Sequence, residues 1–128
     1  MQINNFRIVI DLDNTICDSR NLNGDYINAK PNLNVINKIK EYKKYGYDIV
    51  IHSSRNMRTY ENNIGKINAN TLPIIIEWLN KYNVPYDEIV IGKPWCGKNG
   101  FYVDDRSIRP DEFINLTTNE INEIIKGK

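Results

Sequence analysis

The sequence FRIVIDLDNT, residues 6–15, contains a short apolar run that stops abruptly at acidic residues. A β-branched run of this length, with polar residues directly after it, is typical of a buried strand. The stretch therefore predicts a strand over Phe6–Ile10, with Asp11 and Asp13 just beyond its carboxyl end.

Strands and helices alternate along the rest of the chain. Further apolar runs predict three more strands, at Tyr47–Ile51, Glu88–Ile91 and Phe101–Val103. Apolar residues at helical spacing predict three helices: over Leu33–Tyr45, from Thr71 to Tyr82, and after a capping box formed by Thr117 and Glu120. This order favours an α/β fold, a Rossmann-like three-layer sandwich with a mainly parallel central sheet and helices on both faces.

Length and composition narrow the class of protein. The chain has 128 residues, 41% hydrophobic and 26% charged, which fits one globular domain over residues 1–128. A net charge of +1 gives no basic footprint for nucleic acid, and no apolar run approaches the ~18 residues of a membrane span. Two cysteines do not make a disulfide scaffold, so we expect a cytoplasmic protein.

Chemically capable residues follow all four predicted strands. They are Asp11 with Asp13, then Ser53, then Lys93, and finally the pair Asp104 and Asp105. Each set alone is ordinary for a turn or a strand end. Ligands of an open parallel sheet, however, bind beyond the carboxyl ends of its strands. We therefore expect the four sets to converge on one site.

Up to four carboxylates in one pocket require a balancing charge. Like charges ~4 Å apart repel by about 1 kcal/mol in water and by several times more inside a protein. Oxygen ligands without His or Cys point to a hard cation, Mg²⁺ first, which keeps several waters and binds substrate phosphate. The expected metal ligands are Asp11, Asp13, Asp104 and Asp105.

The other residues at the strand ends fit phosphoryl transfer, which needs mainly positioning and charge neutralisation. Ser53 supplies a hydroxyl donor and Lys93 a positive charge for the phosphoryl group. A carboxylate at Asp11 can attack phosphorus and form an aspartyl-phosphate. Asp13, two residues further along an extended backbone, can protonate the leaving alcohol and then activate the water that cleaves the intermediate.

These motifs resemble those of the haloacid dehalogenase (HAD) superfamily of phosphatases and phosphotransferases. DLDNTI, residues 11–16, is similar to the D-x-D-x-T motif of that superfamily. The other three motifs follow in order: IVIHSSR, which aligns Ser53; GKP, which aligns Lys93; and FYVDDR, which carries the acidic pair.

The resemblance implies a role for each matched residue. Asp11 would be the nucleophile and Asp13 the general acid/base of a HAD-type phosphatase. Mg²⁺ would be held by Asp11, the Asp13 backbone carbonyl, and Asp104 or Asp105. Ser53 and Lys93 would hold the phosphate.

Longer stretches narrow the resemblance further. NMRTYENNIGKIN, LPIIIEWL and GKPWCGKNGFYVDDR are similar to a small bacterial subgroup usually described as capsule- or polysaccharide-biosynthesis phosphatases. This resemblance implies a small phosphorylated sugar, alditol or related precursor as the substrate.

The intervals in which many HAD phosphatases carry a cap domain are short here. Ile16–Pro31 and Arg55–Gly92 leave no room for one, so we expect an open site or a site covered by another subunit of a homo-oligomer. The predicted substrate-binding residues are Asn14, Thr15, Ser54, Arg55, Arg58 and Lys66. The last three lie in the polar stretch 55–70, where cations could bind a second anionic group. An ordinary solvated loop is the alternative there, except at Arg55, which follows the second motif closely.

Three other functions stay open at this point. A phosphotransferase or phosphomutase would use the same machinery, because the sequence does not fix what accepts the phosphoryl group. A phospho-acceptor receiver module uses similar residues, but has its acidic pair near the N-terminus and lacks an acid/base two residues after the acceptor. An inactive binding module on a HAD fold is disfavoured by the intact residue set.

Overall fold

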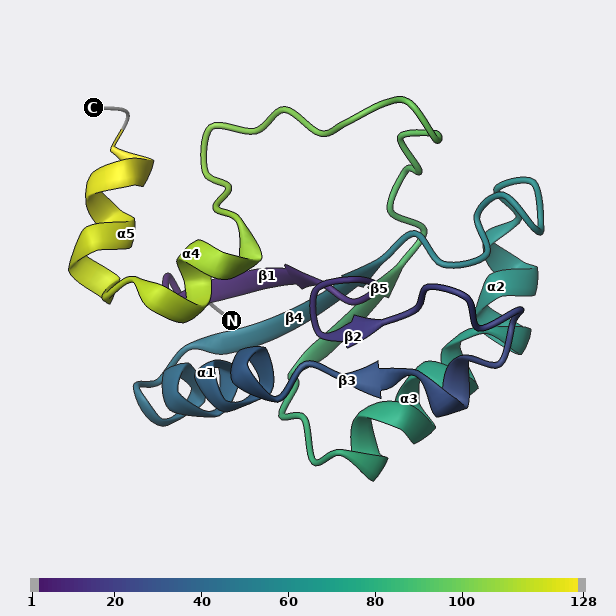
Figure 1. The fold of residues 1–128 in the computed structure, drawn as a ribbon, viewed down its shortest axis with the longest axis horizontal. Coiled ribbons are helices and arrows are strands. Elements are labelled where there is room, and N and C mark those ends of the chain that lie inside the picture. The colour runs from purple at the N-terminus through teal and green to yellow at the C-terminus, as the bar shows by residue number, and fades with distance from the viewer. Residues whose placement is uncertain (1–2, 127–128) are drawn as a thin grey trace. The chain divides into compact units, whose positions relative to one another are not determined.

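The computed structural model describes residues 3–126. The chain divides into two compact units, Met1–Trp95 and Cys96–Lys128, which are described one after the other. The described part of the first unit is a mixture of strands and helices (Figure 1). Its elements are β1 (Arg7–Asp11), β2 (Cys17–Asp18), η1 (Tyr26–Asn28), β3 (Lys30–Pro31), α1 (Leu33–Lys44), β4 (Asp48–Ser53), α2 (Ile64–Asn70), α3 (Leu72–Lys81) and β5 (Glu88–Ile91).

The centre of the first unit is a parallel sheet with the strand order β1-β4-β5. Asp11 lies opposite His52 in this sheet, and Ser53 lies opposite Ile91. The carboxyl ends of all three strands therefore fall at one edge of the sheet. The predicted α/β fold is confirmed, with strand ends that differ from the prediction by at most two residues.

Helix α1 packs its apolar stripe into the core of the first unit. The side chain of Asn32 caps the helix and accepts a hydrogen bond from the Val35 N–H at 3.3 Å. The buried residues of the helix are Val35, Ile36, Ile39 and Tyr42. The chain leaves the helix at Gly46, whose φ of 92° is a conformation that glycine adopts without a steric penalty. This helix confirms the one predicted over Leu33–Tyr45.

Helix α3 ties an irregular segment to the core. Pro73 lies in its first turn, where a missing N–H does no harm. Trp78 is 2% exposed, and its indole N–H donates to the Ala29 carbonyl oxygen at 2.9 Å. Because Ala29 directly follows η1, this hydrogen bond fixes the chain between β2 and β3 against α3.

Replacing Trp78 with Phe is expected to lower the free energy of unfolding by about 1–3 kcal/mol, because the buried Ala29 carbonyl loses its donor. The matched control is Trp95→Phe, since Trp95 is 45% exposed and a surface exchange usually stays within about 0.5 kcal/mol. Urea unfolding followed by circular dichroism measures both variants. Equal midpoints for the two variants would contradict the assigned role of the indole N–H.

Two parts of the first unit depart from the sequence-based expectation. The β2–β3 hairpin and η1 were not predicted, because two-residue strands carry no usable periodicity. The loop predicted over residues 55–70 is wrong for residues 64–70, which form α2. Asn63 explains this helix, since its side chain accepts from the Lys66 N–H at 3.0 Å and caps the helix. Ile67 of α2 is fully buried and anchors the helix.

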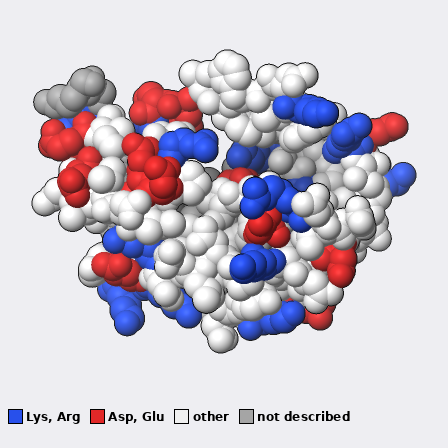
Figure 2. All heavy atoms as spheres, viewed as in Figure 1, with Lys and Arg blue, Asp and Glu red and all other residues white. Residues whose placement is uncertain are grey.

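The surface over the hairpin carries charges of both signs. Figure 2 shows basic and acidic side chains next to one another over β2 and β3, where Arg20 and Asp18 form an ion pair of 2.8 Å. Charges mixed in this way give no extended field of one sign on this part of the surface. Within residues 3–126, no helix combines the length and the apolar character needed to cross a membrane.

The second unit contains two helices among its described residues, α4 (Pro110–Asn115) and α5 (Thr118–Ile125). The predicted capping box is confirmed: Thr117 Oγ1 accepts from the Glu120 N–H at 3.2 Å, and the Glu120 carboxylate accepts from the Thr117 N–H at 2.9 Å. The strand predicted over Phe101–Val103 is wrong, because residues 96–126 contain no strand. Three β-favouring residues need a partner backbone to pair with, and this unit offers none among those residues.

Candidate active site

Asp11 and Lys93 meet at the carboxyl edge of the sheet, although they are 82 positions apart in the sequence. Asp11 is the last residue of β1, and Lys93 follows the end of β5 by two residues. The Lys93 ammonium lies 3.5 Å from Asp11 Oδ1, and the Thr15 hydroxyl donates to Asp11 Oδ2 at 3.4 Å. Burial raises the pKa of Asp11, against the opposing effect of the Lys93 charge.

The turn that delivers Lys93 depends on Gly92. Its φ is 86°, and a Cβ at this position would lie 2.6 Å from Ile64 Cδ1. Glycine therefore allows both the backbone conformation and the close approach of α2. The Lys93 N–H then donates to the Ser53 carbonyl oxygen at 3.0 Å, which fixes the Lys93 backbone against the end of β4.

The segment after β1 wraps around a single carbonyl group. The Leu12 carbonyl oxygen accepts from the N–H groups of residues 15–17 at 2.9 to 3.3 Å. Asn14 has a φ of 62°, in the left-handed region that Asn tolerates better than most residues. Its Oδ1 accepts from the Ser19 N–H at 3.1 Å. These bonds fix the turn over residues 12–19, which begins between Asp11 and Asp13.

Donors surround the carboxylate of Asp13. Arg55 donates from Nε to Oδ2 at 3.1 Å and from Nη2 to Oδ1 at 2.7 Å. The Ser19 hydroxyl also donates to Oδ1, and Cys17 Sγ lies 3.6 Å from the same oxygen. Burial alone would raise the pKa of Asp13, but the hydrogen bonds and charge of Arg55, together with the hydrogen bonds of Ser19 and Cys17, outweigh it and lower the pKa. Without a substrate, Asp13 is therefore an ionised carboxylate at neutral pH.

Two serines, Ser53 and Ser54, lie at and just after the end of the neighbouring strand β4. Ser53 ends β4, is 1% exposed, and accepts a hydrogen bond at Oγ from the Arg55 N–H at 3.0 Å. Because a hydroxyl can accept and donate at once, its own proton stays available for another oxygen. The Ser54 carbonyl accepts from the Met57 N–H at 3.1 Å, which starts the turns that lead towards α2.

The three cations predicted to bind substrate have different surroundings. Arg55 is buried against Asp13, whereas Arg58 and Lys66 are exposed. The Arg58 guanidinium lies 5.6 Å from the centre of the Trp95 ring, and Lys66 is part of α2. Among the described residues of the first unit, neither Arg58 nor Lys66 pairs with Asp11 or Asp13, whereas Arg55 pairs with Asp13.

The acidic pair Asp104 and Asp105 belongs to the second unit. Asp104 Oδ1 accepts from the Arg106 N–H at 2.8 Å within that unit. Within residues 3–95, no three His, Cys, Asp or Glu side chains gather as metal ligands. A part for Asp104 and Asp105 in metal binding therefore stays a prediction from the sequence.

The surroundings of Asp11 fit a hard divalent cation. Burial and the nearby Asp13 charge together outweigh Lys93 and raise the pKa of Asp11, so a further positive charge beside this carboxylate would stabilise its ionised form. An ion held by oxygen atoms would supply that charge. The Asp11 carboxylate and the Asp13 backbone carbonyl would hold the ion, whereas the Asp13 carboxylate is already engaged by Arg55 and Ser19.

Comparison with known proteins shows where the chain belongs. No protein-family model and no curated protein matches it. A crystal structure of a structural genomics target from Vibrio cholerae matches with a TM-score of 0.91 and 51% sequence identity, over 94% of this chain and 97% of the other. The two chains belong to one family. The Vibrio cholerae protein is known here only as a structural genomics target, so membership of this family assigns no activity to the chain.

An open groove of about 700 Å³ lies beside the turn after β1 in this member of the family. The residues that line it are Asn14, Cys17, Asp18, Arg20, Lys30, Pro31, Asn32, Leu33 and Asn34. Of the predicted site residues, Asn14 is in this lining, whereas Asp11 and Lys93 are not. The chemically capable groups therefore lie at the carboxyl edge of the sheet rather than in the groove.

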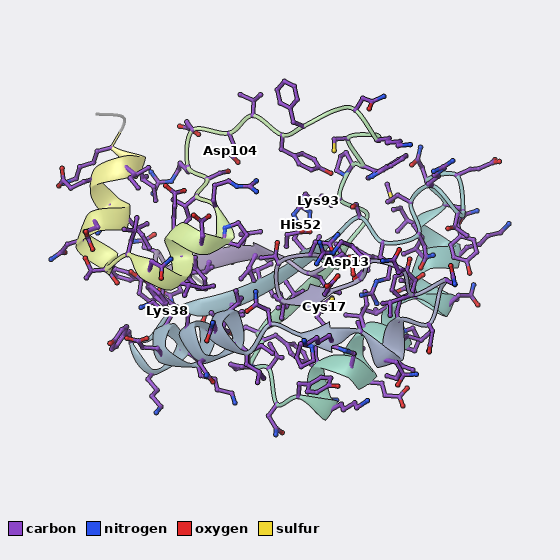
Figure 3. All side chains as sticks on the ribbon, viewed as in Figure 1. Asp13, Cys17, Lys38, His52, Lys93 and Asp104 are labelled. Carbon is purple, nitrogen blue, oxygen red and sulfur yellow. The ribbon has the colours of Figure 1, made fainter. Side chains whose placement is uncertain are left out.

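Cys17 and His52 lie next to the site but do not suit a catalytic role. Cys17 is 2% exposed, and burial raises the pKa of its thiol to about 11, so it stays a neutral thiol at pH 7. His52 lies opposite Asp11 in the sheet, and Figure 3 shows it beside Lys93. Burial and the Lys93 charge lower the pKa of His52, so its imidazole is neutral at pH 7.

Sequence reasoning missed two residues that contact the site. The Ser19 hydroxyl donates to Asp13, and the ring of Tyr26 lies 4.1 Å from the Arg55 guanidinium carbon. Both residues lie in the irregular segment between β1 and α1, where no periodicity predicts which side chains turn inwards. Cation–π stacking of Arg55 on a nearby aromatic ring cannot be inferred from their separation in the sequence.

Proposed function

We propose that this chain is a Mg²⁺-dependent phosphomonoester hydrolase of the HAD type that works through an aspartyl-phosphate. In this proposal the α/β fold is a Rossmann-like three-layer sandwich without a cap domain, and the enzyme is cytoplasmic. The substrate is a small phosphorylated sugar or alditol precursor of a surface polysaccharide, a choice that rests on the resemblance of the longer sequence stretches.

The observation that carries the proposal is the 3.5 Å approach of the Lys93 ammonium to Asp11 Oδ1 at the carboxyl edge of a parallel sheet. A carboxylate can accept a phosphoryl group, and a cation beside it stabilises the negative charge that the phosphoryl group brings. Ser53, at the end of the neighbouring strand, has a hydroxyl proton to donate to a phosphoryl oxygen.

In the first half of the reaction, a carboxylate oxygen of Asp11 forms a bond to phosphorus as the bond from phosphorus to the leaving oxygen breaks. Asp13 gives a proton to that leaving oxygen, which departs as an alcohol. Lys93 and Ser53 bind and orient the phosphoryl oxygens. Mg²⁺, when bound, neutralises charge on the phosphoryl group and orients it for in-line attack.

In the second half, Asp13 acts as an ionised base and takes a proton from water. The water oxygen bonds to phosphorus, the bond between phosphorus and Asp11 breaks, and inorganic phosphate leaves. Asp11 is then a free carboxylate again, and Asp13 holds the proton that it took from the water until the product leaves. The lowered pKa of Asp13, to which Arg55 contributes against the effect of burial, keeps the carboxylate in the ionised form that this base step requires.

Phosphate release from p-nitrophenyl phosphate tests the proposal. We expect turnover with Mg²⁺, loss of turnover in EDTA, and recovery when Mg²⁺ is restored in excess. The same assay with Asp104→Asn and Asp105→Asn tests whether the acidic pair is required, as the sequence predicts, through a raised Mg²⁺ requirement.

Two outcomes would overturn this proposal. Turnover that survives EDTA would exclude the metal dependence. A protein that turns over no phosphomonoester, yet keeps a stable acyl-phosphate after treatment with a small phosphodonor, would favour a receiver-type module instead. If the enzyme is active, a panel of sugar, alditol and nucleotide-sugar phosphates then addresses the substrate.

A further inference from the structure

Arg55 joins the second predicted motif to the first through a partly buried ion pair with Asp13. Its side chain is 2% exposed and donates two hydrogen bonds to the Asp13 carboxylate, from Nε at 3.1 Å and from Nη2 at 2.7 Å. Two parallel N–H···O bonds of this kind fix both the distance and the plane of a carboxylate. The orientation of Asp13 is thus set by a residue that lies 42 positions away.

Arg55 is itself held from two further sides. Its backbone N–H donates to Ser53 Oγ at 3.0 Å, so the residue is tied to the end of β4. Its guanidinium carbon lies 4.1 Å from the centre of the Tyr26 ring, which favours a cation over the ring face. The backbone of Arg55, the hydrogen-bonding edge of its guanidinium and the flat face of that group are thus all restrained. The side chain is therefore pre-organised before any ligand binds.

Stability alone is a poor explanation for this arrangement. Arg55 Nη1 is buried and has no hydrogen-bond partner, which opposes folding. The Asp13 side chain is 24% exposed, so the ion pair is partly buried, and desolvation offsets part of its attraction. An arrangement kept at this free-energy cost, at the carboxylate assigned to proton transfer, points to a functional role.

The hydrogen bonds also distinguish the two oxygens of Asp13. Oδ1 accepts from Ser19 and Arg55 and lies 3.6 Å from Cys17 Sγ, so its lone pairs are fully engaged. Oδ2 accepts from Arg55 Nε alone among the described residues. Oδ2 therefore keeps a lone pair that can hold a proton, whereas Oδ1 does not.

We propose that Arg55 is the positioning residue of Asp13 rather than a substrate ligand: it holds the carboxylate so that Oδ2 exchanges the proton with the leaving oxygen. This inference rests on the proposed function. It replaces the expectation from the sequence that Arg55 binds the substrate. Because Arg55 acts through Asp13, replacing Arg55 should slow a substrate more strongly when the leaving group of that substrate requires a proton.

The test compares two substrates that differ in that need. p-Nitrophenolate leaves readily without a proton, whereas the alkoxide of glycerol 2-phosphate does not. The quantity compared is kcat/KM, which reports steps up to departure of the leaving group. For Arg55→Ala we expect a loss of about 10²-fold on glycerol 2-phosphate, the low end of what general acid catalysis supplies, and a much smaller loss on p-nitrophenyl phosphate.

Three further variants sharpen the test. Arg55→Lys keeps the positive charge but cannot donate two parallel hydrogen bonds to the carboxylate, so it should show the same selective loss on glycerol 2-phosphate. This variant replaces Arg55→Ala in the test if Arg55→Ala folds poorly. In an Asp13→Asn background, Arg55→Ala should add no further loss on glycerol 2-phosphate. Arg7→Ala is the control, because it removes an arginine paired with Glu88 outside the site. Circular dichroism confirms that each variant is folded.

The outcomes separate this inference from the proposed function. Wild-type protein without activity on either substrate would end both. Active wild type, with Arg55→Lys losing equally on the two substrates, would overturn the positioning role and restore Arg55 as a substrate ligand or a purely structural residue. Losses that add fully in the double variant would also overturn it, because Arg55 would then act independently of Asp13.

Discussion

Replacing Asp11 with Asn is expected to abolish turnover of p-nitrophenyl phosphate, a loss on the order of 10⁴-fold or more. The amide cannot form the acyl-phosphate bond, because its nitrogen and its neutral oxygen are poor nucleophiles. The exchange also removes the charge that Lys93 faces at 3.5 Å, but keeps the size of the side chain. Phosphate release, measured at saturating Mg²⁺ and substrate, gives the result.

The matched control for this exchange is Asp18→Asn. Asp18 lies in β2 and pairs with Arg20 at an exposed position, and surface pairs of this kind contribute little. We expect the control to keep wild-type turnover. An Asp11→Asn protein that is folded and turns over at the wild-type rate would remove Asp11 from the chemistry and with it the covalent mechanism.

Replacing Asp13 with Asn is expected to lower kcat/KM by about 10²–10⁴-fold on a substrate with an alkoxide leaving group. The amide can neither give a proton to the leaving oxygen nor take one from water. In the free protein Arg55 lowers the pKa of Asp13, against the effect of burial, and keeps the carboxylate ionised. A bound phosphoryl dianion would act in the opposite direction and favour the protonated form needed for the first step.

Initial rates on glycerol 2-phosphate and p-nitrophenyl phosphate measure this variant. We expect the larger loss on glycerol 2-phosphate, and accumulation of phosphoryl-enzyme because the base of the second step is missing as well. An Asp13→Asn protein with equal, small losses on both substrates would show that another residue transfers the proton.

The fold was predictable wherever it depends on local pattern. The apolar runs behind β1, β4 and β5 and the helical stripe of α1 are visible in the sequence, because burial of one face imposes a period. The hairpin β2–β3 and α2 lack such a period. The strand expected over Phe101–Val103 is wrong because β propensity cannot supply a partner backbone.

The candidate site was predictable to the extent that parallel strands end at one edge. This rule places Asp11, Ser53 and Lys93 together without any knowledge of side-chain geometry. The pairing of Arg55 with Asp13 follows no such rule. It depends on the conformation of two irregular segments, and such contacts leave no pattern in a single sequence.

The central claim, a covalent phosphoryl-enzyme at Asp11, is tested most directly by trapping it. The Asp13→Asn variant is mixed with p-nitrophenyl phosphate and Mg²⁺, quenched in acid within the first turnover and digested, and the modified peptide is identified by mass spectrometry. We expect one phosphoryl group on the peptide that contains Asp11, and none when Asp11 is also replaced by Asn. Release of p-nitrophenol with no phosphoryl group on the protein at any time, or with the group on another residue, would contradict the claim.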